Sequence, residues 1–155
     1  MGMDVFGKQP ISETGKYFRN NVWWWHPLWS FCECAADDLI PEDNSGHENS
    51  GWGLDACQSA QLATRLETLL ECGVVRGYSE ARTAALAAQP DQDCAICAGT
   101  GKRKAVPQMG AGDQPCNGCD SSGQVRPWSA NYPFDEDNVR EFAAFLRDCG
   151  GFEIC

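Results

Sequence analysis

The sequence predicts a small α+β protein, with a body of about four helices, a short N-terminal β-hairpin and an inserted ribbon that contains four cysteines. Apolar residues recur at helical spacing in several segments, which indicates amphipathic helices. An alternating stretch near the start indicates strands, and two CxxC pairs mark the ribbon. We divide the chain into a body at residues 1–90, the ribbon insertion at residues 91–126, and a helix and tail at residues 127–155 that complete the body.

Two segments near the N-terminus predict the hairpin. Residues 3–6 alternate between apolar and polar types, and residues 17–25 are rich in the aromatic residues that strands favour. In a strand, Trp23, Trp24 and Trp25 would point to opposite faces in turn, so we expect helices to cover both faces and bury them. The alternative is that these tryptophans form a stacking or partner-binding surface.

The first helix is expected to begin at Pro27, because proline suits the first position of a helix. It would end near Asp38. An acidic, polar stretch follows at residues 41–53, which we interpret as a solvated loop, with a docking patch for a basic partner as the alternative.

The clearest helix signal begins at Asp55. This residue is a good N-cap, and Gln58 three residues later completes a capping box. Gly73 is the expected stop. A further helix is predicted over residues 80–88, with Ser79 as its N-cap, packed antiparallel to the preceding helix.

The last helix is expected to be capped by Asp135 or Asp137. Its apolar face is formed by Val139, Phe142, Ala143 and Leu146. The tail at residues 152–155 is expected to add a short strand or to fill the core.

Cysteine spacing is the strongest chemical signal in the chain. The two CxxC knuckles place Cys94 and Cys97 in one arm and Cys116 and Cys119 in the other. Four thiolates at this spacing can close a tetrahedral site around one structural Zn²⁺ ion. The alternatives are two disulfides or four free thiols, which the spacing does not favour.

The first knuckle, Cys94-x-x-Cys97-x-Gly99-x-Gly101, resembles the CxxCxGxG repeat of the DnaJ-type cysteine-rich zinc domain. The second knuckle has Ser121 where that repeat has glycine. The family has four repeats and this chain has two, enough for one metal ion. The His-Pro-Asp signature of the J-domain is absent, so the resemblance implies a zinc-binding fold and not co-chaperone activity.

A second resemblance covers the start, the tryptophan run and the end of the chain. Met3-Asp-Val-Phe-Gly7, the stretch from Tyr17 to Trp25 and the stretch from Phe142 to Cys155 are similar to a family of uncharacterised bacterial and phage-borne proteins. That resemblance implies no activity.

Composition limits the choice of partners and compartment. The formal net charge of -10 repels nucleic acid at long range. No segment has the features of a signal peptide or of a membrane span. Ten cysteines without export signals are typical of metal binding in a reducing compartment, so we expect a cytoplasmic protein.

Other residues have weaker signals. The chain's dense basic cluster is Lys102, Arg103 and Lys104. Together with Arg126 it gives the ribbon four cations, which could contact phosphate or could only solubilise the ribbon. A second metal site is conceivable, although its spacings match no ligand pattern. It would use His26, Cys32, His47 and Cys57. Cys57, Cys72 and Cys149 are expected to be small apolar fillers in helices.

These features favour a non-enzymatic protein-interaction module with a structural four-cysteine zinc site. One alternative is nucleic-acid binding through the basic tip of the ribbon. Another is an enzyme whose pocket lies beside the tryptophans. A variant of the main hypothesis is an acidic protein that imitates the charge of DNA. The partner, the substrate and the oligomeric state do not follow from the sequence.

Overall fold

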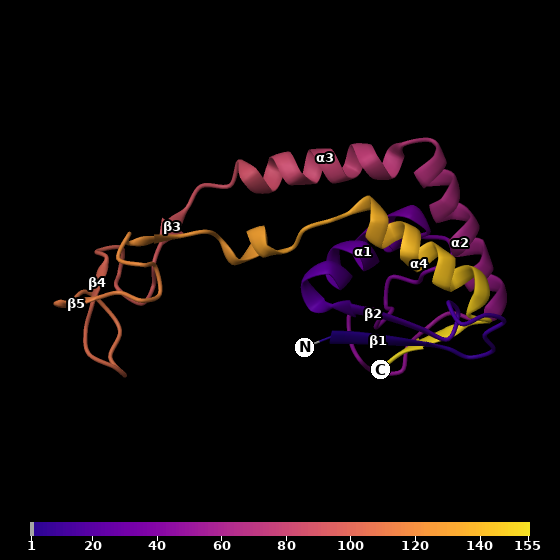
Figure 1. Ribbon diagram of the computed structural model, residues 1–155, viewed down its shortest axis with the longest axis horizontal. Helices are drawn as coiled ribbons and strands as arrows, with labels where there is room; N and C mark the ends of the chain where they lie inside the picture. Colours follow the sequence, from indigo (N-terminus) through magenta and orange to yellow (C-terminus); the bar gives the residue numbers. More distant parts are fainter. Residues whose placement is uncertain (1) are drawn as a thin grey trace. The chain divides into compact units, whose positions relative to one another are not determined.

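The computed structural model describes residues 2–155, and the chain divides into two units. The first unit, residues 1–83 with 132–155, is an α+β body, and the second unit, residues 84–131, contains the two cysteine knuckles. The predicted ribbon insertion falls within the second unit. Four helices, a small sheet with an N-terminal strand pair and the cysteine cluster confirm the predicted α+β class (Figure 1). Across residues 2–155, no helix combines the length and apolar character that a membrane crossing requires.

The sheet of the body has three antiparallel strands. Strand β1 (Gly2–Gly7) lies in the centre, between β2 (Tyr17–Asn21) and β7 (Phe152–Ile154). Val5 of β1 is opposite both Phe18 and Ile154. The predicted N-terminal hairpin and the predicted C-terminal strand are therefore both confirmed.

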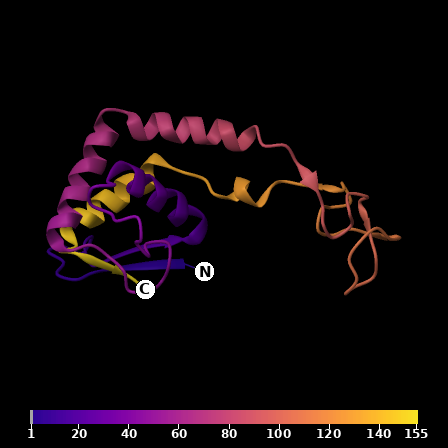
Figure 2. The same ribbon diagram turned by 180° about the vertical axis from the view of Figure 1, so that it is seen from behind.

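One face of this sheet is covered and the other is open. Val5, Phe18 and Ile154 are buried, whereas Phe6 and Tyr17, on alternate positions, are each more than 40% exposed. Helices α1 (Val22–Ala35) and α4 (Glu136–Asp148) contact the sheet, and both lie over the same side of it in Figures 1 and 2. The expectation that helices cover both faces is wrong.

The tryptophan run belongs to helix α1 and not to a strand. The Asn21 side chain caps this helix by accepting hydrogen bonds from the backbone amides of Trp23 and Trp24. The chain therefore turns into a helix four residues before the predicted end of the strand. Pro27 consequently lies inside the helix rather than at its first position, and the helix ends at Ala35 rather than near Asp38.

Helix α2 (Ala56–Glu71) begins as predicted. Asp55 accepts a hydrogen bond from the Gln58 amide at 2.8 Å, and the Gln58 side chain accepts one from the Asp55 amide at 3.2 Å. Gly73 follows the helix with a positive φ of 78°, a conformation that suits glycine.

Helix α3 (Val74–Ala87) corrects two predictions. It begins five residues before Ser79, the expected cap, and the Ser79 hydroxyl instead donates a hydrogen bond to the Phe134 carbonyl within the body. The antiparallel partner of α2 is α4 rather than α3. Arg147, at the end of α4, bonds Thr64 and Glu67 in the middle of α2.

The core of the body is aromatic. Trp25 and Trp29 are fully buried and stacked, with ring centroids 5.5 Å apart. Phe142 meets Trp25 edge to face at 5.6 Å, and the four residues predicted to form the apolar face of α4 are all buried. Asp135 caps α4 by accepting a hydrogen bond from the Asp137 amide.

The second unit contains little regular structure apart from two short strand pairs. The strands are β3 (Gln92–Asp93), β4 (Lys102–Arg103), β5 (Gln114–Pro115) and β6 (Gln124–Val125). Strand β3 pairs with β6 and β4 pairs with β5, both antiparallel. A short 3₁₀ turn, Trp128–Asn131, follows them.

Candidate metal centre

The four knuckle cysteines converge on one point. Their sulfur atoms all lie within 4.8 Å of one another, and all four residues are buried. The Sγ atoms of Cys94 and Cys116 are 3.9 Å apart, and those of Cys97 and Cys119 are 3.7 Å apart. These separations are far too long for disulfide bonds, which join sulfurs at about 2.05 Å. The cluster can hold a metal ion.

The sulfur separations also fit a particular coordination geometry. A tetrahedral ion with metal–sulfur bonds of about 2.3 Å places its ligands about 3.8 Å apart, since the edge of a tetrahedron is about 1.6 times the centre-to-vertex distance. The two separations given above, 3.9 and 3.7 Å, lie on either side of this value. The donor set of four thiols therefore matches a tetrahedral site in number, type and spacing.

The two knuckles are built in the same way. The Gly99 amide donates to the Cys94 carbonyl at 3.2 Å, and 22 positions later the Ser121 amide donates to the Cys116 carbonyl at 2.9 Å. Backbone hydrogen bonds also join the two knuckles to each other. The Cys94 amide donates to the carbonyl of Gly123, and the Cys116 amide donates to the carbonyl of Gly101. The unit is thus a structural repeat whose two halves support each other's ligands.

A hydroxyl at the same position of each knuckle closes the turn behind the sulfurs. Thr100 donates to the Cys97 carbonyl at 2.8 Å, and Ser122 donates to the Cys119 carbonyl at 2.6 Å. Each hydroxyl also accepts a hydrogen bond from the amide two residues later, Lys102 in one knuckle and Gln124 in the other. These bonds hold the second cysteine of each pair in place.

The turns require left-handed backbone, and Ser121 shows this most clearly. Gly99 has a φ of 76°, and Ser121, at the equivalent place in the second knuckle, has a φ of 64°. Glycine adopts this region freely, whereas a residue with a Cβ atom adopts it at a cost. Gly101 is needed for a second reason, because a Cβ atom there would lie 2.3 Å from the Ser121 carbonyl oxygen.

The thiols differ in their acidity. Burial opposes ionisation of Cys97, but a hydrogen bond from the Gly101 backbone and bonds from the neighbouring thiols outweigh burial and lower its pKa to about 7. Burial raises the pKa of Cys116 to about 11. Cys97 therefore ionises more readily than Cys116, whose proton a bound cation would have to displace.

Comparison with protein-family models, with curated proteins and with solved structures found no match. The similarity to the uncharacterised bacterial and phage-borne family gains no support from these comparisons. The four-cysteine cluster is compatible with a zinc ribbon, which is the part of the DnaJ-type resemblance that the structure supports.

The predicted basic residues lie on or beside both strand pairs of the second unit. Lys102 and Arg103 are on β4, and Arg126 follows β6. The Arg103 guanidinium donates to the Asn117 side-chain oxygen at 2.8 Å, and Arg126 donates to the Leu86 carbonyl at 3.0 Å. Both bonds are to neutral oxygens, so they leave the positive charges uncompensated.

The structure separates the three tryptophans proposed as a partner-binding surface. Trp25 has no exposed surface, so it belongs to the core and cannot contact a partner. Trp23 is half-buried against the Tyr132 ring, with centroids 5.1 Å apart. Trp24 is half-buried and lines a small cavity of about 230 Å³ together with Asn20 and Asn138.

The suggested second metal site is not assembled from its four predicted residues. His26 and His47 lie together, but Cys32 is fully buried in the core and burial raises the pKa of its thiol. Cys57 is exposed on α2, where its sulfur accepts a hydrogen bond from Gln61. Burial, together with the neighbouring His47, lowers the pKa of His26. Sequence spacing could not identify the histidine pair, because a loop contact joins two distant residues.

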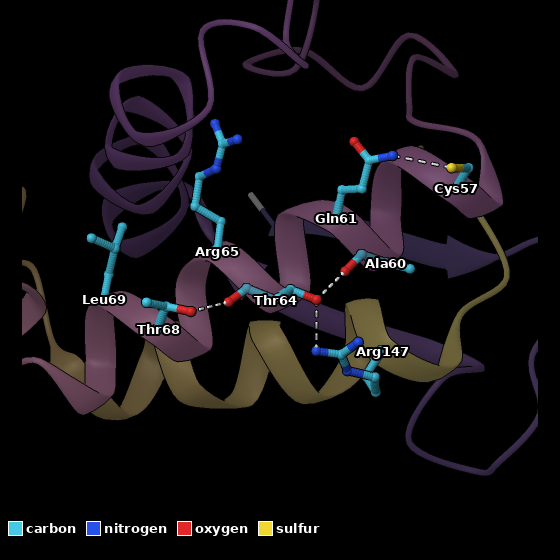
Figure 3. A pocket seen from close by; sticks show the side chains of 8 residues that line it. All are labelled: Cys57, Ala60, Gln61, Thr64, Arg65, Thr68, Leu69 and Arg147. Atoms are coloured by element: carbon cyan, nitrogen blue, oxygen red, sulfur yellow. Dashed lines mark hydrogen bonds between the residues drawn. The ribbon is translucent and has the colours of Figure 1, made fainter.

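A cavity of about 600 Å³ runs along the outer face of α2 (Figure 3). Two arginines border the cavity, and each donates hydrogen bonds to other residues of the body. Arg65 donates to Asp38 and to the Ala35 carbonyl, and Arg147 donates to Glu67 and Thr64. Both arginine charges are therefore paired with carboxylates of the body and do not indicate a ligand site.

Proposed function

We propose that this chain is a protein-interaction module whose second unit is folded around one structural Zn²⁺ ion. The supporting observation is the group of four buried sulfurs within 4.8 Å of one another, two pairs of which lie at the separation of a tetrahedral edge. Zinc is the ion most typical of such a site, and four cysteine ligands leave it no open position for a reacting water molecule. The ion's role would be to supply folding free energy to a segment with little core of its own.

The tip between the knuckles is the surface we assign to the partner. Val106 is 75% exposed and Met109 is 61% exposed, on the loop that joins β4 to β5. Lys102 and Lys104 are exposed at its base. Exposed apolar side chains bordered by cations fit a partner surface with an apolar recess and an acidic rim.

The test uses a tip variant that keeps the metal site. Tagged protein carrying Val106→Ser and Met109→Ser is compared with wild type in pull-downs quantified by mass spectrometry. Ile11→Ser is the matched control, since Ile11 is 81% exposed on the other unit. We expect partners that are lost with the tip variant and retained with the control. If no protein is enriched over an unrelated acidic protein, the proposal fails.

Nucleic-acid binding is the second candidate, and the four cations of the second unit support it. No ion pair within residues 2–155 joins Lys102, Arg103, Lys104 or Arg126 to a carboxylate. Cations of this kind are available to phosphates. The net charge of -10 on the whole chain opposes this function.

The two candidates differ in their dependence on salt. Phosphate binding would weaken steeply with salt, and Lys102→Glu with Lys104→Glu would abolish it. Lys8→Glu with Lys16→Glu, a pair of exposed lysines on the body, is the control with the same change of charge. Binding that is lost equally in both double variants would be a general charge effect and would reject a site at the ribbon tip.

A further inference from the structure

One face of helix α1 holds the polar loop at residues 41–53 through side-chain hydrogen bonds. The Nδ1 atoms of His26, on the helix, and His47, in the loop, are 2.8 Å apart. The other ring nitrogen of His47, Nε2, lies 3.1 Å from a carboxylate oxygen of Glu33, two turns further along α1. The second oxygen of Glu33 accepts a hydrogen bond from the Asn44 amide group at 2.8 Å.

The residue before His47 is fixed by two buried indoles. The Trp25 indole N–H donates to the Gly46 carbonyl at 2.8 Å, and a Cβ atom on Gly46 would lie 2.1 Å from the Trp29 indole nitrogen. Trp29 in turn donates to the Asn44 side chain at 3.0 Å, and the same oxygen accepts from the Gly46 amide. The position of His47 is therefore set by the core and is not a chance contact of a free loop.

Glu33 determines which nitrogen of His47 is available. An ionised carboxylate only accepts hydrogen bonds, so Nε2 of His47 must carry the proton. A neutral His47 then has its lone pair on Nδ1, directed at Nδ1 of His26. A carboxylate that binds the far nitrogen of an imidazole is the usual support of a metal-ligating histidine, since it fixes the ring and raises its basicity.

We propose that His26 and His47 form a second metal site, which binds a divalent transition ion through both Nδ1 atoms. Two ligands at about 2.0 Å from an ion and at right angles are about 2.8 Å apart, the separation seen here. Imidazole nitrogen suits Ni²⁺, Cu²⁺ and Zn²⁺, and right-angled positions suit Ni²⁺ and Cu²⁺ in particular. Glu33 acts as the positioning residue for His47.

The proposed site differs from the cysteine site in being open. Within residues 2–155, the four cysteines form the only group of three or more metal-ligating side chains that meet at one point, so the histidines would supply two ligands and water the remainder. Both histidines are partly exposed, so an ion can reach them. An ion held this way keeps coordination positions for a further ligand.

The chain's histidine content makes the test specific. It has two histidines, so labelling histidine alone with ¹⁵N gives four ring-nitrogen signals. Ni²⁺, which is paramagnetic, is titrated into protein whose cysteine site is already filled with Zn²⁺. We expect all four signals to broaden together and to saturate at one Ni²⁺ per chain. Signals that stay sharp would show that the pair shares only a proton, and would overturn the proposal.

Three variants separate the ligands from their support. His47→Asn should leave the His26 signals sharp at the Ni²⁺ concentration that broadens them in wild type. Glu33→Gln keeps the shape of the side chain and should weaken Ni²⁺ binding by about 10- to 100-fold. Cys34→Ser, an exposed thiol next to Glu33, should change nothing. An equal loss of Ni²⁺ binding in the Cys34 variant would assign the ion to that thiol and reject the histidine site.

Near-ultraviolet circular dichroism of the tryptophans serves as the folding check for each variant. If His47→Asn alters the spectrum of the body, the comparison of Glu33→Gln with wild type tests the site instead, because that substitution keeps the size of the side chain while it removes the charge and one of the two acceptor oxygens. Ni²⁺ binding of unchanged strength in Glu33→Gln would contradict the role given to Glu33.

Discussion

The two units of this protein are stabilised in opposite ways. The body buries a continuous cluster of large apolar side chains in which Trp25, Trp29 and Phe142 have no exposed surface. In the second unit the buried cluster is the four cysteines themselves, with only Ile96 and Val125 packed against them as partly buried apolar residues. The body can therefore fold by burial of apolar surface, whereas we expect the second unit to need the ion that its sulfurs could bind.

The units also differ in charge. Residues 84–131 contain four Lys or Arg and four Asp or Glu, so the whole formal charge of -10 is on the body. Six of the eight basic residues on the body form ion pairs, and none of the four on the second unit does so within residues 2–155. The body uses its cations internally, and the second unit leaves them available to a partner.

Removal of the metal should have the largest effect on folding, and it should affect the second unit but not the body. Chelation, or Cys116→Ser, should abolish amide protection over residues 92–126, because metal binding supplies about 10–16 kcal/mol in small zinc sites. The strands β1 and β2 should stay protected. Hydrogen exchange measured by mass spectrometry reports both regions in one experiment.

The control for this experiment is Cys57→Ser, which changes an exposed cysteine outside the cluster. It should leave the exchange of both units unchanged. Knuckle amides that remain protected after complete chelation would show that the second unit does not depend on a metal.

The converse experiment disrupts the body. Trp25→Ala removes a buried ring that stacks on Trp29 and donates to the Gly46 carbonyl, and it should destabilise the body by about 3–5 kcal/mol. Trp24→Ala, at the half-buried neighbour, should cost clearly less. Urea unfolding followed by tryptophan fluorescence measures both. Zinc affinity should stay at the wild-type value, and a change in it would contradict the independence of the two units.

The contrast between the units explains what could be read from the sequence. The knuckles were predictable because each cysteine pair is local and the ligand chemistry fixes the spacing. Helices α2 and α4 were predictable for a similar reason, since their caps and apolar stripes are contained in the segment itself. The α+β class followed from these elements.

The tryptophan run and helix α3 could not be read in this way. Aromatic residues favour strands in general. Here the segment from Trp23 is helical, because Asn21 caps the helix and the helix buries Trp25. Ser79 has the composition of a cap, yet its hydroxyl is used in a tertiary contact with Phe134. The histidine pair depends on a loop folding back over α1, a contact between residues 21 positions apart that no local pattern encodes.

A smaller effect is expected from the cap of α2. Asp55→Ala removes the hydrogen bond that the Asp55 carboxylate accepts from the Gln58 amide and should cost the body about 1 kcal/mol. Gln58→Ala removes the other bond, which the Asp55 backbone amide donates to the Gln58 side chain, and should cost less, because a neutral amide oxygen is a weaker acceptor than a carboxylate. Urea midpoints rank the two variants, and an equal or reversed order would contradict the larger contribution assigned to the Asp55 carboxylate.

The second unit offers a stabilising change of similar or smaller size. Ser121→Gly relieves a left-handed residue at the place where the first knuckle has Gly99, and should stabilise the unit by about 0.5–1 kcal/mol. Since folding and metal binding are coupled, the gain should appear as a several-fold tighter zinc affinity in a chelator competition. Ser122→Gly, which loses the hydroxyl that bonds Cys119, should weaken the affinity. Weaker binding by both variants would show that the strain at Ser121 is not relieved by glycine.

The smallest effect on stability is expected from the exposed ion pairs of the body. The lowered pKa of Asp38 gives the direction in which this effect changes with pH. A hydrogen bond from Arg65 lowers the pKa of Asp38 below its ordinary 3.8. A carboxyl group with a lowered pKa in the folded state adds stability above its unfolded pKa, and this contribution is lost as the pH falls through the folded value. Asp38→Asn should therefore flatten the dependence of the melting temperature on pH below about 4.

The control is Asp43→Asn, at an exposed carboxylate without an ion pair in residues 2–155, which should preserve the wild-type slope. Because exposed ion pairs contribute little and salt screens them, the difference between the variants should shrink further at high ionic strength. A slope that is the same in all three proteins would mean that the Arg65 pair organises the surface of α2 without contributing to stability.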